Sequence, residues 1–440
     1  MIDDLFTSIA AVAESIVKNA KLDVGSAVLS LCRKILVKAA VYPRPEPSEK
    51  ADENFDMPAW GPTPKIEAAQ GLMHLSSNWG LDNELESLIL ILSTDKSPAV
   101  RFQIANGLGG IYNHSRELFW QIADSMQAAE RATGVFVTLA RTVGHAYIAK
   151  REPENVVRWL KASLRRKSPK RRPEDLYGAI LDSLIYLYVY LNAQSANQLL
   201  RSIEKSPMRS ARLLQIMANS ASYYLDYNIE SSDSVATEVR VKAREVELRM
   251  LAAVDQAFRS IEGPLSATKR TAAKRAETVQ QLLVAVDRLV FRLHMIINAN
   301  PQYQQPDDKP ASDHVVRDFF KESAGLWDAV VSADSDYRRP IGPSTAHHLM
   351  ESFNRLLPFN PEHVLKLAWR LITGRTLGYQ FDQMAIGEFV GFAEKILADH
   401  RALLREEVNA VRFAEILDVF VSAGWPQATQ IVLRMDAAVR

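Results

Sequence analysis

The stretch from Leu81 to Tyr112 constrains the fold of this chain more than any other. Its apolar residues recur at three- and four-residue intervals on both sides of a central turn: Leu85, Leu88, Ile89 and Leu92, then Val100, Ile104, Leu108 and Ile111. This spacing predicts two helices, each with one apolar face. In the turn, Ser97 is a candidate N-cap through its side-chain oxygen, and Pro98 suits the first helical position. One hairpin cannot bury both faces, so it must pack against further helices, as in a stack of repeats.

The turn of this hairpin resembles the HEAT-repeat signature D-x-x-P-x-V-R-x-x-A-x-x-x-L. The matching residues are Asp95, Pro98, Val100, Arg101 and Leu108, with Ala105 one position away from the strict spacing. A partial second copy, Lys205 to Ser210, keeps the proline and the arginine without the aspartate. The resemblance implies a HEAT-like α-solenoid of stacked helical hairpins, in which Asp95 and Arg101 form a hydrogen-bonded ladder between adjacent repeats.

Helical spacing continues through most of the chain, interrupted by two proline-rich stretches. The predicted segments, in chain order, are an N-terminal helical hairpin at 1–41, a Pro-rich linker or strap at 42–64, HEAT-like helical repeats ending in a long helix pair at 65–299, a linker at 300–312 and a C-terminal helical array at 313–440. No alternating strand pattern or Asn-Gly hairpin signal appears, so the predicted fold class is all-α.

The two longest predicted helices cover about Ser234 to Ile261 and Ser266 to Asn298. The second carries a heptad-like seam of apolar residues: Val279, Leu282, Val286, Leu289, Leu293 and Ile296. Such a seam is typical of an antiparallel coiled-coil hairpin within the chain or of a dimer surface. Both alternatives stay open from the sequence, and the oligomeric state is not predicted.

Composition limits the classes of protein to which the chain can belong. Apolar residues make up 47% and charged residues 24% of its 440 residues, which predicts an ordered globular protein. A formal net charge of +1 gives no overall attraction to nucleic acid or membranes. The lone Cys32 lies on an apolar helix face, which predicts a buried thiol. No apolar run is long enough to span a bilayer and the start is acidic, so we expect a cytoplasmic protein with no membrane partner.

Two basic clusters are candidate nucleic-acid contacts. The first consists of Arg165, Arg166, Lys167, Lys170, Arg171 and Arg172, between two predicted helices; the second consists of Lys269, Arg270, Lys274 and Arg275, at a helix start. Clustered cations neutralise phosphates and give salt-dependent binding. Stacking aromatics are missing from the first cluster, and a solvated helix face is the favoured interpretation of the second.

Catalytic and metal-binding templates fit poorly, so no catalytic residue, cofactor or metal site is predicted. The glycines at 107–110 lack the following G-K-[ST] of a phosphate-binding loop. His347, His348 and His363 form the closest histidine group, but no cysteine or H-E-x-x-H pattern accompanies them. The spacing of Arg288 and His294 resembles the R-x5-H motif of helical ribonucleases of the HEPN class. This resemblance implies that the two residues polarise a phosphodiester.

The leading functional hypothesis is a non-catalytic solenoid scaffold or sensor subunit that binds another protein. The block from Trp60 to Arg101, beginning WGPTPKIEAAQGLMHLS, also looks like segments near the C-termini of large bacterial NTPase-linked antiviral proteins. That resemblance implies a place in a bacterial antiviral defence assembly. The alternatives are a nucleic-acid-binding helical module using the two basic clusters, and a helical ribonuclease.

Overall fold

The computed structural model describes residues 2–43, 62–166, 173–231, 233–262, 269–298 and 312–439. The chain forms two compact units, Met1–Leu199 and Leu200–Arg440. Both units are built from helices, and no strand occurs in the described ranges beyond one isolated bridge between Pro340 and Arg375. The predicted all-α fold class is therefore confirmed.

The helices of the first unit follow one another with short connections. Their bounds are α1 (Ile2–Asn19), α2 (Ala27–Ala40), α4 (Pro64–Trp79), α5 (Asn83–Ser93), α6 (Pro98–Ile111), α7 (Arg116–Ala129), α8 (Thr133–Val143), α9 (Ala146–Ala149), α10 (Pro153–Arg165) and α11 (Pro173–Val189). Helix α12 (Gln194–Glu204) crosses the boundary between the units. The Leu81–Tyr112 hairpin is thus α5 and α6, as predicted.

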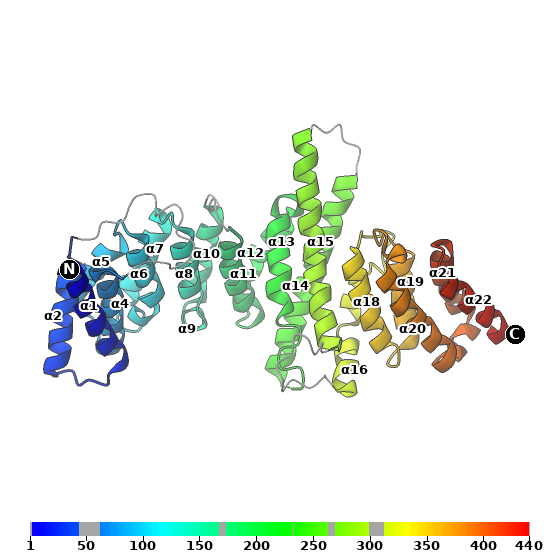
Figure 1. Ribbon diagram of the computed structural model, residues 1–440, viewed down its shortest axis with the longest axis horizontal. Coiled ribbons are helices and arrows are strands. Elements are labelled where there is room, and N and C mark those ends of the chain that lie inside the picture. The colour runs from blue at the N-terminus through cyan, green and yellow to red at the C-terminus, as the bar shows by residue number, and fades with distance from the viewer. Residues whose placement is uncertain are drawn as a thin grey trace. The chain divides into compact units, whose positions relative to one another are not determined.

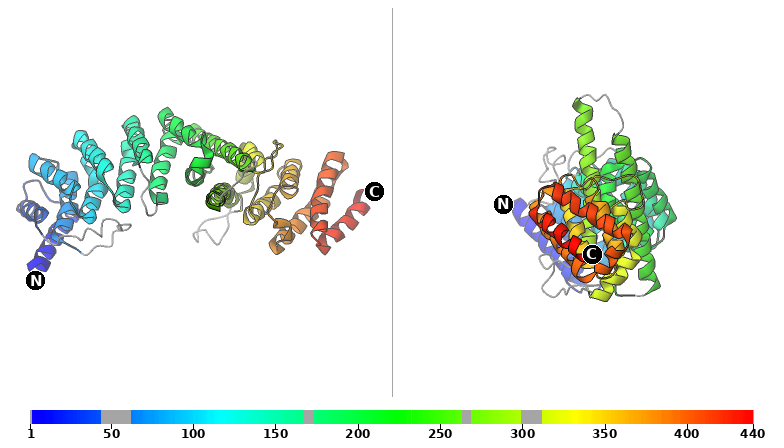
Figure 2. Two further views of the ribbon diagram at one scale, coloured as in Figure 1. Left: turned by 90° about the horizontal axis from the view of Figure 1, so that it is seen from above. Right: turned by 90° about the vertical axis from the view of Figure 1, so that its right-hand side faces the viewer.

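The first unit is a stack of helical hairpins in two layers. Helices α4, α6, α8 and α11 each pack against the next along one layer, while α5, α7 and α10 cover them from the other side. Successive helices of this unit lie side by side in Figures 1 and 2. Each apolar face is buried only because a neighbouring hairpin covers it, which is the arrangement expected of a HEAT-like helical repeat.

Local sequence signals explain where these helices begin. Thr63 caps α4 by accepting a hydrogen bond from the Ile66 N–H at 3.3 Å, and Ser115 caps α7 in the same way. Ser97 occupies the N-cap position of α6, as predicted, but its hydroxyl makes no capping bond. The Asp95 carboxylate instead accepts a hydrogen bond from the Ser97 N–H at 2.8 Å, so the turn is held by the aspartate and the predicted hydroxyl cap is wrong.

The glycines at 107–110 have a packing role in α6. A Cβ atom placed on Gly107 would lie 2.5 Å from Cβ of Met73, and one on Gly110 would lie 2.7 Å from Cβ of Ser77. Both neighbours belong to α4, so these two glycines let α4 and α6 approach closely. Gly109 points towards α8 instead, where a Cβ atom would meet Thr142 at an ordinary contact distance of 3.7 Å.

The second unit contains longer helices and two short 3₁₀ turns. The bounds are α13 (Pro207–Ser222), α14 (Ser234–Glu262), α15 (Lys269–Asn298), α16 (Asp313–Glu322), α17 (Ala324–Val330), α18 (Pro343–Leu356), α19 (Pro361–Ile372), η1 (Tyr379–Phe381), α20 (Gln383–Asp399), η2 (Arg401–Arg405), α21 (Glu407–Ser422) and α22 (Pro426–Val439). Helices α13, α15, α18, α20 and α22 pack in sequence, and α19 packs against α21. This unit is also a helical stack.

The heptad-like seam of α15 is buried inside the chain. Leu282, Leu289 and Leu293 are fully inaccessible to solvent. Helix α15 packs most extensively against α13 and α18, and much less against α14. The apolar seam is therefore used within the second unit, although its main neighbours are not the preceding helix of the predicted pair.

The predicted linkers lie almost wholly outside the described residues. Of the strap at 42–64 only the first two and last three residues are described, and of the linker at 300–312 only Ser312, which precedes α16. The predicted segment boundaries stay predictions. The buried thiol of Cys32 is confirmed, since its residue is 3% exposed.

Candidate functional site

Charged side chains connect the turns of successive repeats in the first unit. The Asp95 carboxylate pairs with Lys65 at 3.0 Å, so the start of α4 is tied to the turn before α6. Arg101 donates from its guanidinium to the Asp95 carbonyl at 2.6 Å and to the Glu130 carboxylate at 2.7 and 2.9 Å. Glu130 also accepts from the backbone N–H of Ala132, just before α8, at 2.8 Å. On these contacts we propose that Asp95 and Arg101 fill the ladder role implied by the HEAT resemblance.

A groove runs between α6 and α8, which are neighbours in one layer of the helical stack. Its volume is about 600 Å³. The residues that line it, called the α6–α8 groove below, are Phe102, Asn106, Gly109, Asn113, Thr138, Arg141, Thr142, His145, Tyr147 and Ile148. Those contributed by α6 and the turn after it recur every three or four residues, so one helix face forms one wall. From Phe102 to Asn113 this wall is roughly 17 Å long, at about 1.5 Å per helical residue.

One end of the α6–α8 groove is held in place by a polar network. The Tyr147 hydroxyl donates to Oδ1 of Asn113, and the Arg151 guanidinium lies 3.6 Å from the centre of the Tyr147 ring. Behind them, the Tyr112 hydroxyl donates to Glu152 at 2.7 Å. Burial and this hydrogen bond raise the pKa of Tyr112 to about 12, so the phenol stays protonated. This end of the groove is therefore held in place without a bound ligand.

The chemistry of the α6–α8 groove is apolar with neutral and cationic groups. Phe102 supplies accessible apolar surface, Ile148 lies buried beneath the groove, and Arg141 is exposed. None of the described residues that line the groove is acidic. The amides of Asn106 and Asn113 carry both donors and acceptors, which suits them to the main chain of an extended peptide.

The first predicted basic cluster is only partly described. Arg165 is exposed at the end of α10, and Lys167, Lys170, Arg171 and Arg172 lie outside the described residues. Arg166 folds back onto the end of α7, where it donates to the carbonyls of Gln127 and Glu130, the latter at 2.8 Å. Its guanidinium also lies 4.7 Å from the Phe136 ring centre, so Arg166 is engaged in packing.

In the second predicted basic cluster, Lys274 is exposed and Arg275 is half-buried on α15. Lys269 and Arg270 begin α15, but their side chains are not among those that the structure describes. Nucleic-acid binding through either cluster stays a prediction.

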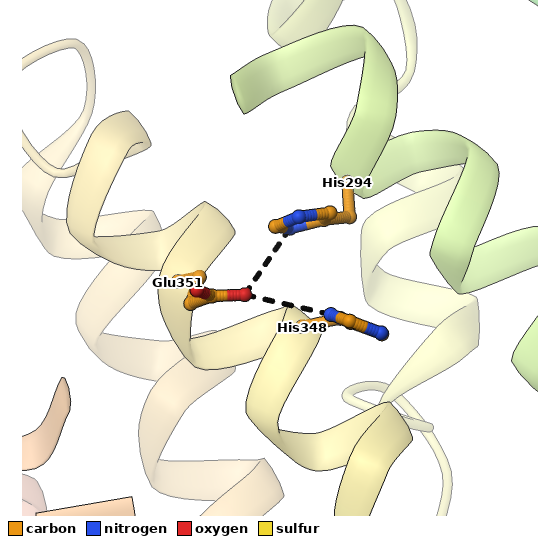
Figure 3. A group of neighbouring side chains, drawn as sticks. All are labelled: His294, His348 and Glu351. Atoms are coloured by element: carbon orange, nitrogen blue, oxygen red, sulfur yellow. Dashed lines mark hydrogen bonds and ion pairs between the residues drawn. The ribbon is translucent and has the colours of Figure 1, made fainter. Parts of the chain in front are cut away.

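A second candidate site lies in the second unit, between α15 and α18. His294 projects from α15 towards His348 and Glu351 of α18 (Figure 3). One ligand atom from each of the three residues lies within 4.8 Å of the other two. Such a set of two imidazoles and one carboxylate is able to hold a metal ion.

The surroundings of His294 favour its neutral form. The residue is 4% exposed. Burial and the nearby His348 lower the pKa of His294, although Glu351 acts in the opposite direction. At neutral pH the imidazole is therefore uncharged, which is the form that binds metals.

Of the residues singled out from the sequence, His347 and His348 lie together beside Glu351, whereas His363 and Arg288 lie apart from them. His363 lies elsewhere and pairs with Asp328 at 3.1 Å. Arg288 is exposed while His294 is buried, because six residues turn a helix by about 600° and place the two on different faces. The ribonuclease alternative gains no support from this placement.

Three groups of functional residues could not be found from the sequence by spacing alone. Glu130 had one signal, since it follows Asp95 by about one repeat in an equivalent turn. The α6–α8 groove is formed by residues from different repeats. Glu351 was missed because its proximity to His294 depends on the contact between α15 and α18.

Comparisons with known proteins found similar solved structures at low sequence identity and no related sequence. No family model matches the chain, and no curated protein sequence matches it. Similar solved structures include a circular tandem repeat protein with novel repeat topology, at 13% identity and a TM-score of 0.41, covering 98% of each chain. Another is the karyopherin Kap121p bound to the extreme C-terminus of the protein phosphatase Cdc14p, at 12% identity and a TM-score of 0.34, covering 100% of this chain and 53% of that one.

A third is the N-terminus of TSC2, at 12% identity and a TM-score of 0.31, covering 93% of this chain and 99% of that one. The chain spans about half the length of Kap121p, of which it covers 53%. The resemblance to bacterial antiviral proteins stays an expectation. Among the described helices, none combines the length and hydropathy required to cross a lipid bilayer.

Proposed function

We propose that this protein is a scaffold that binds an extended, acidic segment of a partner protein in the α6–α8 groove. The observation that carries the proposal is the groove itself, a hollow of about 600 Å³ with no acidic lining residue among those described. A wall of roughly 17 Å accommodates about five residues of extended peptide at about 3.3 Å each. A compact small molecule is shorter than this wall.

The partner's chemistry follows from the lining. Arg141 attracts a carboxylate, and the amides of Asn106 and Asn113 hydrogen-bond main-chain groups. Phe102, which is half-buried, contacts an apolar side chain of the partner. Asn113 and Arg151 already hold the Tyr147 side chain in place. Peptide binding therefore orders few side chains of the groove, and the small loss of conformational entropy favours affinity.

The test is a titration of the full chain with fluorescent ten-residue peptides that share alternating leucines and differ in their charged positions, either Glu or Lys. We expect the acidic peptide to bind about tenfold more tightly than the basic one, a difference of about 1.4 kcal/mol. Arg141→Glu reverses this preference, because it places a negative charge in the groove.

The matched control is Lys161→Glu, the same change of charge at an exposed position on α10, away from the groove. It leaves both affinities unchanged. Equal binding of the two peptides by the unaltered chain, or equal effects of the two variants, contradicts the proposal.

Two finer hypotheses about function stay predictions. A place in a bacterial antiviral assembly depends on the sequence resemblance alone. Nucleic-acid binding depends mainly on cations outside the described residues, while the described Arg166 is already occupied by the end of α7.

A further inference from the structure

The distances from Glu351 to His294 and to His348 are close to the edges of a metal-coordination tetrahedron, and all three ligand atoms lie within 4.8 Å of one another. Nδ1 of His348 lies 3.4 Å from Oε2 of Glu351, and Nδ1 of His294 lies 3.7 Å from the same oxygen. Both distances exceed a normal hydrogen bond of about 2.7–3.2 Å. Two ligands of a tetrahedral Zn²⁺ ion, each about 2.0–2.1 Å from the metal, lie about 3.3 Å apart.

The surroundings of this trio also fit a metal site. His347 also belongs to α18. Its Nε2 atom lies 3.6 Å from Oε1, the other carboxylate oxygen of Glu351. A histidine beside the second oxygen orients a ligating carboxylate, as outer-shell partners of metal sites do. The Nδ1 atom of His347 is buried and has no hydrogen-bond partner in the described structure.

One contact competes with an ion. The Asn298 amide nitrogen lies 2.9 Å from Nδ1 of His294, and the Ser352 hydroxyl lies 3.5 Å from it. The amide must turn aside when an ion binds through this nitrogen. Asn298 is the last residue of α15, and its amide also donates to the Ser352 hydroxyl at 3.4 Å.

We propose that His294, His348 and Glu351 bind one divalent transition-metal ion of the zinc class, with water in the fourth position. The donor set of two imidazoles and one carboxylate suits zinc and cobalt and is a poor match for calcium or magnesium, which prefer oxygen ligands. The bound ion links α15 to α18 within the second unit. This inference is independent of the α6–α8 groove, which belongs to the first unit.

The test is a titration of the full chain, stripped with EDTA and dialysed, with Co²⁺ followed by visible absorption. We expect one Co²⁺ per chain with the intense absorption of a tetrahedral site, displacement by Zn²⁺, and a rise in Tm on binding. Glu351→Gln, which nearly preserves side-chain volume, and His348→Ala weaken Co²⁺ binding at least about tenfold.

The matched control is His314→Ala, at an exposed histidine of the same unit outside the trio. It leaves Co²⁺ affinity and the absorption spectrum unchanged. Circular dichroism establishes that each variant is folded; if His348→Ala is not, Glu351→Gln decides alone. The proposal is overturned if the unaltered chain shows no tetrahedral absorption, or if Glu351→Gln binds Co²⁺ as the His314→Ala control does.

Discussion

Glu247 is the least satisfied side chain in the described part of the second unit. It lies in α14, its residue is 0% exposed, and neither carboxylate oxygen has a hydrogen-bond partner among the described residues. Burial raises the pKa of Glu247 well above its usual value. The protonated acid is therefore favoured in the folded chain, at a cost to stability.

We expect Glu247→Met to stabilise the second unit by about 1–3 kcal/mol, the usual cost of an unpaired buried polar group. The gain grows as pH rises from about 4.3, because the unfolded glutamate then loses its proton while the folded one keeps it. Urea unfolding at pH 4.5, 6 and 8 measures this difference. Below the unfolded pKa the linkage contribution disappears.

Glu247→Gln is the control, because it keeps an unpaired polar group but cannot ionise. It should remove the pH-dependent part of the difference while staying less stable than Glu247→Met. Parallel pH curves for the unaltered chain and Glu247→Gln contradict this account of the buried acid.

At the residue scale, prediction from the sequence succeeded where the burial of a side chain is determined by its position on its own helix. Cys32 lies on an apolar face, and its burial followed from helical spacing. The Ser97 cap failed because Asp95, two residues earlier, holds the Ser97 N–H. The group of His294, His348 and Glu351 could not be predicted, since His294 and Glu351 are brought together only by packing between α15 and α18.

At the scale of elements, periodicity located helices well and their contacts poorly. Within the predicted helical repeats at 65–299, the segment 133–149 is divided into α8 and α9 around Gly144. The heptad-like seam of α15 was recognised, but its main neighbours are α13 and α18. A repeat spacing tells which face of a helix is buried; it does not tell which helix covers that face.

The glycines of α6 give a direct test of how tightly the hairpins pack. In an ordinary helix, Gly→Ala is stabilising by about 1 kcal/mol. Gly107→Ala should instead lower the stability of the first unit by about 1–3 kcal/mol, because the added Cβ lies 2.5 Å from Cβ of Met73 and the helices must move apart. The thermal unfolding midpoint measures the effect.

Gly178→Ala is the matched control in α11, in the same layer of helices. A Cβ atom there has no neighbour within 4 Å, so alanine should raise the midpoint. If both substitutions raise the midpoint, α4 and α6 are not in the close contact described here.

At the scale of the whole molecule, each of the two units is a stack whose helices bury one another's apolar faces. The HEAT resemblance predicted this architecture from one good repeat, because one-sided helices have few ways to hide their apolar residues. The sequence could not predict the α6–α8 groove, which depends on the distance between helices of successive repeats. The function proposed for the chain depends on that groove.

Hydrogen exchange of the full chain, with and without a saturating acidic peptide, tests the central claim most directly. Binding in the groove should slow exchange in α6, α8 and the segment 144–148 that carries Tyr147, and leave α5, α7 and α10 on the other layer unchanged. Saturation by the peptide with no slowing in α6 and α8, or with protection confined to α5, α7 and α10, contradicts the account.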